Sequence, residues 1–319
     1  MKTDTKEKFR TAIGGQAVIE GIMMRGVDKA VVVVRTGEGL ESKELPVGKP
    51  RPKKHILAWP FIRGLVGFVS SLSLGMKALN YSASMYAEDS VEETDETTEP
   101  GKFDKWFEKH EKAATGIITT IAMVLGFALA IGLFTLLPTL LGSQLVKLNF
   151  ITNFWRGICE GVIRVIVFLC YLFLVSKLKD IQRVFSYHGA EHKTIACYEA
   201  GEELTVENVN SFTRFHPRCG TSFLLNVVII SILLFMWVPF DGYLIRIALR
   251  LALLPGVVMI AYEFNRWAGK HDGIVSRALR APGLWLQRLT TNEPDVAMIE
   301  VGIKSLVAVL PDEKGTDEW

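Results

Sequence analysis

The sequence predicts a mainly α-helical protein that crosses a membrane several times and carries a small β element at its N-terminus. Several uncharged runs reach the roughly 20 residues that a helix needs to cross the hydrocarbon layer. Hydrophobic residues make up 49% of the chain and the mean hydropathy is +0.26, which is atypical of a soluble enzyme. Charged residues still make up 22%, more than a uniformly apolar transporter would hold. We therefore expect about four apolar spans joined to substantial polar segments.

Residues 1–55 form the expected N-terminal cytoplasmic segment. The first ten residues, MKTDTKEKFR, contain no apolar stretch and do not resemble a secretory signal. Ala17–Met24 and Ala30–Arg35 are rich in β-formers, and glycines follow both runs. These residues predict a small β element.

Residues 56–87 predict a partly buried amphipathic helix, because Arg63 and Lys77 interrupt the apolar residues. The alternatives are a helix on the membrane surface and a re-entrant hairpin. The following residues 88–112 predict a disordered acidic linker. Within it, residues 88–99 contain seven acidic residues and no basic one, too polar to bury a core.

Four apolar runs predict the membrane-spanning helices. The first two lie within residues 113–176 and the other two within residues 220–264, the latter joined by a short Asp241–Gly242 turn. The runs are Ile117–Leu137, which is bounded by Pro138, about 151–176, Thr221–Phe240 and Tyr243–Tyr262.

The distribution of lysine and arginine predicts the orientation of these spans. Residues 1–112 contain 18 of these cations, the loop 177–219 six and the tail 265–319 seven, whereas the connection 141–156 contains two. Because cytoplasmic segments are enriched in such residues, we expect both termini and the loop 177–219 in the cytoplasm of a cell membrane.

The tail ends in a predicted helix. Thr290–Thr291 could cap it, and Pro294 would lie in its first turn. Apolar residues recur downstream at helical spacing: Ile299, Ile303, Leu306 and Leu310.

Several charged residues lie within or at the edges of the predicted spans. Charges there are costly, so they should face the bundle interior and pair, with Glu160 facing Arg164 or an arginine of the fourth span. Structural pairing explains them more simply than a polar pathway or a headgroup site. These residues are Arg156, Glu160, Arg164, Arg246, Arg250 and Glu263.

The loop 177–219 contains a candidate metal site. His188 and His192 stand one turn apart if residues 187–200 form a helix, which Gly201 would end. Glu199 would lie near the same face, and Cys197 nearly opposite. The intervening Glu191 completes the pattern H-x-x-E-H, in which two histidines bind zinc and the glutamate polarises water.

A second motif, His216-Pro217-Arg218-Cys219, supplies two further candidate ligands. Imidazole nitrogen and thiolate sulfur are the ligands that zinc prefers, and structural sites take four of them. His188, His192, His216 and Cys219 therefore predict a zinc ion rather than magnesium or calcium. A closed structural site competes with a catalytic one in which Glu191 is the base. Alternatively, no metal binds and the histidines lie near lipid headgroups, with His216 capping the next span.

Four stretches resemble the YqhQ-like bacterial membrane proteins, catalogued as domain of unknown function 1385. They are GGQAVIEGIMMRG (14–26), RVFSYHGAEHKTIACYEAGEELT (183–205), FHPRCGTSF (215–223) and LQRLTTNEP (286–294). The similarity covers about residues 13–310. It implies a multi-pass membrane protein and a role as a metal-dependent enzyme that rests on the same His and Cys residues.

Three functions follow from the sequence. The first is a membrane scaffold or binding protein whose zinc site fastens the loop 177–219 to the third span. The second is a metal-dependent hydrolase at the inner membrane face, and the third is a small-solute transporter that uses the intramembrane charges. The expected partners are the lipid bilayer and another membrane protein or a second copy. The net charge of +2 and the absence of a basic tract interleaved with aromatics indicate no nucleic acid.

Overall fold

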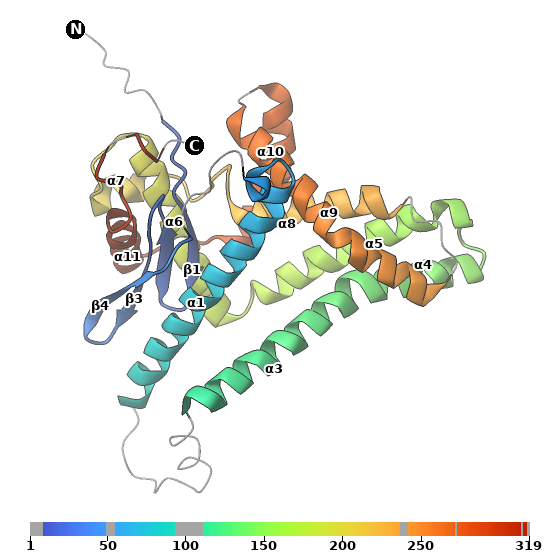
Figure 1. Ribbon diagram of the computed structural model, residues 1–319, viewed down its shortest axis with the longest axis horizontal. Coiled ribbons are helices and arrows are strands. Elements are labelled where there is room, and N and C mark those ends of the chain that lie inside the picture. The colour runs from blue at the N-terminus through green and yellow to red at the C-terminus, as the bar shows by residue number, and fades with distance from the viewer. Residues whose placement is uncertain are drawn as a thin grey trace, which may run out of the picture. The chain divides into compact units, whose positions relative to one another are not determined.

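The computed structural model describes residues 9–48, 55–92, 111–236, 242–271, 273–313 and 315–317 (Figure 1). The chain divides into two compact units. The first comprises Met1–Val91, Leu172–Ile230 and Pro255–Trp319, and the second comprises Glu92–Tyr171 and Ser231–Leu254.

The N-terminal β element is confirmed as a four-stranded antiparallel meander. A two-residue turn divides the predicted strand Ala17–Met24, because Val18 pairs with Gly21 and Glu20 takes a positive φ of 48°. The expected second strand is extended to Thr36, and a further strand pairs with it. The strands are β1 Gly14–Val18, β2 Gly21–Arg25, β3 Ala30–Thr36 and β4 Gly39–Leu45.

Other elements cover both faces of this sheet. Successive side chains of β2 and β3 point to opposite sides, so each strand contributes apolar side chains to both faces. On one face the buried side chains include Met23 and Val32, which pack with Leu74 and Ala78. These two residues belong to α1 (Ile62–Glu92). The expected helix at residues 56–87 is shifted along the chain, because α1 begins at Ile62 and ends at Glu92, within the acidic run. Residues 93–110 of the expected linker lie outside the described residues.

The other face of the sheet packs against α6 (Lys179–Glu199) and α11 (Val296–Val307), as Figure 1 shows. This core, which we call the three-part core, is formed by residues from the beginning, middle and end of the chain. Its buried members include Ile13, Ile22, Met24 and Val33 from the N-terminal part, Tyr187 and Ala190 from α6, and Val301 and Leu306 from α11.

The C-terminal helix is present but begins differently from the prediction. Asp295 caps α11 by accepting a hydrogen bond from the Met298 amide, and Thr290 is the last residue of the preceding helix. The remaining helical elements of the first unit are η1 Ile56–Ala58, α7 Val206–Ser211 and α10 Ile274–Thr290.

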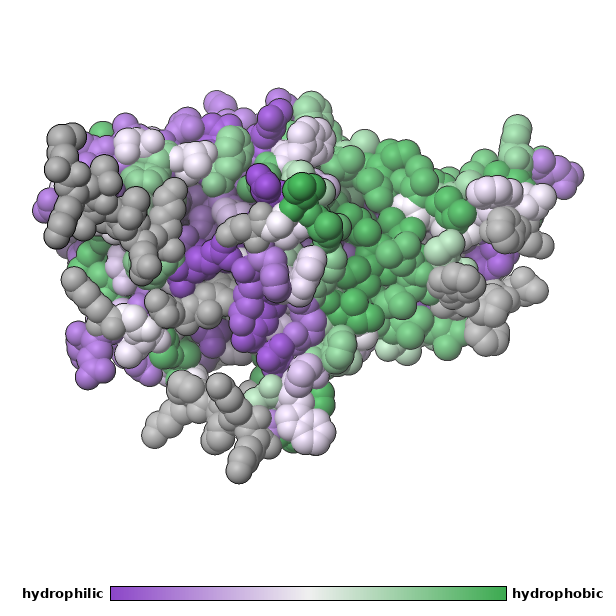
Figure 2. Space-filling model, turned by 90° about the horizontal axis from the view of Figure 1, so that it is seen from above, coloured by the Kyte–Doolittle hydropathy of each residue, from purple (hydrophilic) through white to green (hydrophobic). Residues whose placement is uncertain are grey.

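Long apolar helices build the second unit, and α5, α8 and α9 also contribute residues to the first. Figure 2 shows a broad hydrophobic area over these helices and a mixture of hydrophilic and hydrophobic side chains over the rest of this face. On α3, Leu125 and Phe127 are 64% and 66% exposed. The helices are α3 Glu111–Ile131, η2 Gly132–Leu136, α4 Leu137–Lys147, α5 Asn153–Val175, α8 Gly220–Phe235 and α9 Tyr243–Lys270.

Pro138 does not end the first span. The chain continues through a π-helical turn, η2, into α4. A proline has no N–H for the carbonyl four residues earlier. That carbonyl, of Phe134, accepts a hydrogen bond of 2.7 Å from Arg164 Nε of α5, so a side chain replaces the missing donor.

Four described helical stretches are long and apolar enough to cross a membrane, which confirms the expected number. They are Ile62–Glu88, Thr120–Lys147, Trp155–Val175 and Leu244–Lys270. The set differs from the expected one in two helices. α1 is long and apolar enough to be included, and the described part of α8, Gly220–Phe235, is too short. The expected end of that span and Asp241 of the hairpin turn lie outside the described residues.

The buried charges pair as expected within the second unit. Glu160 contacts Arg246 at 3.0 Å and also binds Arg250, and all three side chains are almost fully buried. Glu263 instead belongs to the first unit, where it forms a two-pronged ion pair with Arg63 of α1. Arg156 is half-buried on α5.

Candidate metal centre

Three of the four expected zinc ligands come together in the first unit. His188 and His192 lie one turn apart on α6, with ring centroids 4.3 Å apart. Cys219 immediately precedes α8, and its Sγ lies 3.2 Å from His188 Nε2. One ligand atom from each residue lies within 4.8 Å of the other two. The predicted helix, with Gly201 at a φ of 68° after its end, is what aligns the two histidines.

Hydrogen bonds to carbonyls fix both imidazoles. His188 Nδ1 lies 2.9 Å from the Thr290 carbonyl, and His192 Nδ1 lies 2.6 Å from that of Arg214. A carbonyl can only accept, so each Nδ1 donates to it, and in the neutral form of each ring the lone pair is on Nε2. Metal-binding histidines are typically oriented by such bonds from the other ring nitrogen.

The donor set fits zinc. A tetrahedral zinc ion holds imidazole nitrogen and thiolate sulfur about 3.5 Å apart, close to the 3.2 Å between His188 and Cys219. Burial acts to raise the pKa of Cys219, but His192 and hydrogen bonds from Thr221 outweigh it, so the pKa lies below its ordinary value. Burial and the charge of the neighbouring His188 lower the pKa of His192, although the Cys219 sulfur opposes them. Both shifts favour the forms that bind metals.

Glu191 lies beside this cluster. Its side chain is buried, and burial raises its pKa to about 7; the Cys219 sulfur adds to the effect, and His188 and the Gly15 N–H oppose it. Its Oε2 has no hydrogen-bond partner within the described chain. A carboxyl group with a pKa near neutrality and a free oxygen can accept and return a proton.

His216 is held apart from the other three ligands. Its backbone N–H and carbonyl both bond to the Gln287 side chain at 2.8 Å. Its Nε2 lies 3.5 Å from the Glu199 carboxylate, and its ring centroid is 5.5 Å from that of His192. Among the described residues, the structure therefore brings together three candidate ligands, and His216 lies beside them, between His192 and Glu199.

Glu199 holds the surroundings of the site together. It forms an ion pair with Arg218 and accepts a 2.8 Å hydrogen bond from the Thr11 N–H. Burial acts to raise its pKa, but bonds from His216 and Arg218 outweigh it and the pKa lies below its usual value. Cys197, excluded from the expected site, is buried in a separate apolar cluster with Val209 and Ile299.

Sequence reasoning missed the residues that complete the site through their backbones. A Cβ at Gly15 would lie 2.8 Å from the Glu191 carboxyl carbon, so any larger residue there would have to displace the Glu191 side chain. Thr290 and Arg214 act through carbonyl groups, which leave no signature in residue type. The Gly14–Gly15 pair was the one visible signal of a close contact.

Residues 59–312 match the family described as "Protein of unknown function (DUF1385)". The chain is also 37% identical over 313 residues to "Uncharacterized protein YqhQ" from Bacillus subtilis (strain 168), covering 96% of this chain and 94% of that protein. No solved structure matches the chain. The family match spans most of the chain and the relative nearly all of it, so this protein belongs to the DUF1385 family, as its four sequence stretches predict.

Proposed function

We propose that this protein is a zinc-dependent hydrolase of the cell membrane, with His188, His192 and Cys219 as metal ligands. The observation that carries the proposal is the convergence of these three donors beside a buried carboxyl group, Glu191, with a pKa of about 7. Catalytic zinc sites have three protein ligands and leave one position for water, whereas structural sites close with four.

The roles of the residues follow from their contacts. Bound zinc would supply a water molecule ionised near neutral pH. Glu191 would hold that proton at Oε2, where no described residue competes for it. The carbonyls of Thr290 and Arg214 fix the histidine tautomers, so the lone pairs of both Nε2 atoms remain available.

A structural zinc site is the second candidate, and the burial of the cluster favours it. His192 is 1% exposed and Cys219 6% exposed, and the site joins α6 to the start of α8. In that case the metal fastens the loop after α6 to the membrane helices, and the protein acts as a scaffold. Transport finds less support, because the intramembrane Glu160 is already paired with Arg246 and Arg250.

Metal analysis of the purified full-length protein tests the ligand set. We expect about one zinc per chain, lost in His188→Ala, His192→Ala and Cys219→Ser because each removes a donor. His216→Ala and Glu191→Gln should retain it, and Glu203→Gln, at an exposed position, is the control. A wild-type protein without any transition metal contradicts both zinc hypotheses.

A cobalt-substituted sample separates catalysis from scaffolding without a known substrate. An open position would let acetohydroxamate bind the metal, so the visible cobalt spectrum should change and Glu191→Gln should weaken that binding. A spectrum that stays unchanged at saturating hydroxamate indicates a closed structural site.

A further inference from the structure

A cavity of about 340 Å³ lies in the first unit, lined by α1, the start of α8 and the end of α9. It differs from the candidate metal centre, although Arg218 and Gly220 on its wall flank Cys219 in sequence. Cavities that hold small ligands begin at roughly this size. The volume exceeds what one isolated anion or water molecule needs, so any ligand should extend beyond its charged group.

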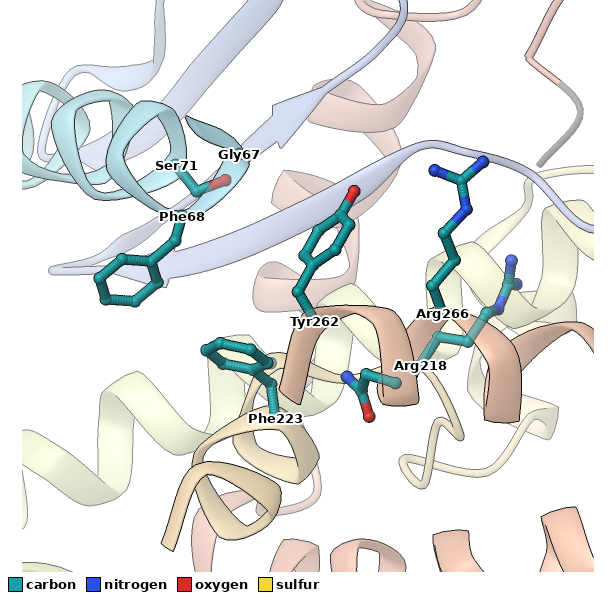
Figure 3. A pocket seen from close by; sticks show the side chains of 9 residues that line it. Gly67, Phe68, Ser71, Arg218, Phe223, Tyr262 and Arg266 are labelled. Carbon is teal, nitrogen blue, oxygen red and sulfur yellow. The ribbon is translucent and has the colours of Figure 1, made fainter. Parts of the chain in front are cut away.

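One side of this cavity is aromatic. The rings of Phe68 from α1 and Phe223 from α8 lie 6.0 Å apart at a tilt of 37°. Tyr262 of α9 packs against Gly67 and completes the wall. Figure 3 shows these rings together, with the guanidinium groups of Arg218 and Arg266 on the other side. The cavity is therefore amphipathic, apolar along one wall and cationic along the other.

The two arginines differ in their electrostatic state. Arg218 is neutralised by Glu199. Arg266 has no hydrogen-bonded acceptor among the described residues. Its closest carboxylate on the helix, Glu263, is occupied by the Arg63 guanidinium and the Phe61 N–H. The charge of Arg266 acts on Glu263 without a hydrogen bond, so the N–H groups of its guanidinium are available to an anion. The planar fork of a guanidinium suits phosphate or carboxylate oxygens.

The position of the cavity selects among anionic ligands. Arg266 lies one turn before the end of α9, whose preceding residues from Leu244 are apolar enough for a membrane span. Gly220 begins the apolar α8. The cation is therefore at the polar end of membrane-type helices, where lipid headgroups lie, and the aromatic wall continues toward their apolar parts.

We infer that this cavity binds an anionic phospholipid, with the headgroup phosphate on Arg266 and the start of an acyl chain against Phe68 and Phe223. The phosphate neutralises the charge of Arg266, and the acyl chain fills the part of the cavity that a free anion would leave empty. This inference does not depend on the proposed zinc chemistry. It assigns a specific lipid site to α1, α8 and α9, distinct from the surface that contacts the bilayer without specificity.

Native mass spectrometry of the full-length protein in detergent tests this site with three probes: dioleoylphosphatidylglycerol, dioleoylglycerol and inorganic phosphate. We expect phosphatidylglycerol to bind about tenfold more tightly than dioleoylglycerol, because a charge-assisted hydrogen bond distinguishes them. Arg266→Gln should abolish that preference, and Arg266→Lys should restore part of it. Arg25→Gln, a matched charge change on β2 outside the cavity, should leave it intact.

Phe223→Ala provides an independent variant. Loss of the aromatic wall should weaken both lipids about equally and leave the preference for the anionic one. The inference is overturned if Arg266→Gln keeps the preference. It is also overturned if inorganic phosphate displaces the lipid, which would make the cavity a site for free phosphate.

Discussion

At the scale of single residues, Glu199 connects three parts of the chain that are distant in sequence. Its carboxylate binds Arg218 beside the cluster of His188, His192 and Cys219, lies 3.5 Å from His216 Nε2, and accepts a hydrogen bond from the N–H of Thr11 ahead of the sheet. The Arg218 guanidinium and the Thr11 N–H both donate to the charged form of the carboxyl group. Removing that charge therefore takes the Glu199 carboxylate away from the buried Arg218 guanidinium.

We predict that Glu199→Gln lowers the free energy of unfolding at neutral pH by about 3 kcal/mol, the range for breaking a buried ion pair. Because its folded pKa lies below the ordinary value of 4.5, Glu199 stabilises the fold above that pH. This contribution is lost as the pH falls through the folded pKa. Thermal melts of the variant and the wild type should therefore converge below pH 4.5, and Glu203→Gln is the exposed control. Parallel melting curves down to pH 3 would contradict this role.

At the scale of elements, the sequence predicted α6 and the small β element well but placed several boundaries wrongly. Helical spacing of His188 and His192 and the terminating Gly201 are local signals, and the structure follows them. The turn between β1 and β2 was missed because Ala17–Met24 is a continuous β-rich run. Pro138 was expected to end a helix, but its missing hydrogen bond is replaced by Arg164, which is distant in sequence.

In the candidate site, too, features with local sequence signals were predicted, and features that depend on residues distant in sequence were not. His188, His192, Glu191 and Cys219 could be named because their residue types carry the chemistry. The separation of His216 could not be predicted, since it depends on how Gln287 of α10 holds its backbone. The contact between α6 and the segment after α10 could not be predicted either, because it combines a backbone hydrogen bond from Asn292 to Phe185 with the ion pair of Lys193 and Glu293, which are 100 residues apart in sequence.

Gly189 is where α6 meets that segment most closely. A Cβ there would lie 2.1 Å from the Asn292 carbonyl oxygen, and the nearby Thr290 carbonyl holds His188. We predict that Gly189→Ala costs about 1–3 kcal/mol of stability through overpacking. It should also weaken zinc binding roughly tenfold through the displaced hydrogen bond. Competition with a zinc chelator and thermal melts measure both, and Gly14→Ala, which meets no atom within 4 Å, is the control. An unchanged zinc affinity would show that the Thr290 contact is dispensable.

At the scale of the whole molecule, the three-part core restricts the membrane topology. The sheet precedes α1, α6 follows α5, and α11 follows α9, yet all three pack together. They must lie on one side of the membrane, so the chain crosses an even number of times between each pair. α1 has the lowest mean hydropathy of the four candidates, 1.3, and packs on the sheet through Leu74 and Ala78. We therefore expect α3–α4, α5, α8 and α9 to cross, with α1 on the membrane surface.

Labelling of single cysteines in intact cells with an impermeant reagent tests this topology, with the wild-type protein giving the background from the four native cysteines. Phe150→Cys, at an exposed position between α4 and α5, should react from outside. Glu38→Cys, after β3, and Glu203→Cys, after α6, should react only when the membrane is permeabilised. Opposite accessibility of Glu38→Cys and Glu203→Cys would show that α1 crosses.

The three-part core also has a consequence for biosynthesis, because it cannot form until the last of its three parts has been synthesised. The sheet leaves the ribosome first, but the face formed by Ile22, Met24 and Val33 is covered only after α6 and then α11 have been made. Until Val301 and Leu306 of α11 arrive, the nascent chain exposes an apolar sheet face while its membrane segments are being inserted. Quality-control proteases that act on exposed apolar surface could therefore distinguish finished chains from those that stop short of the last helix.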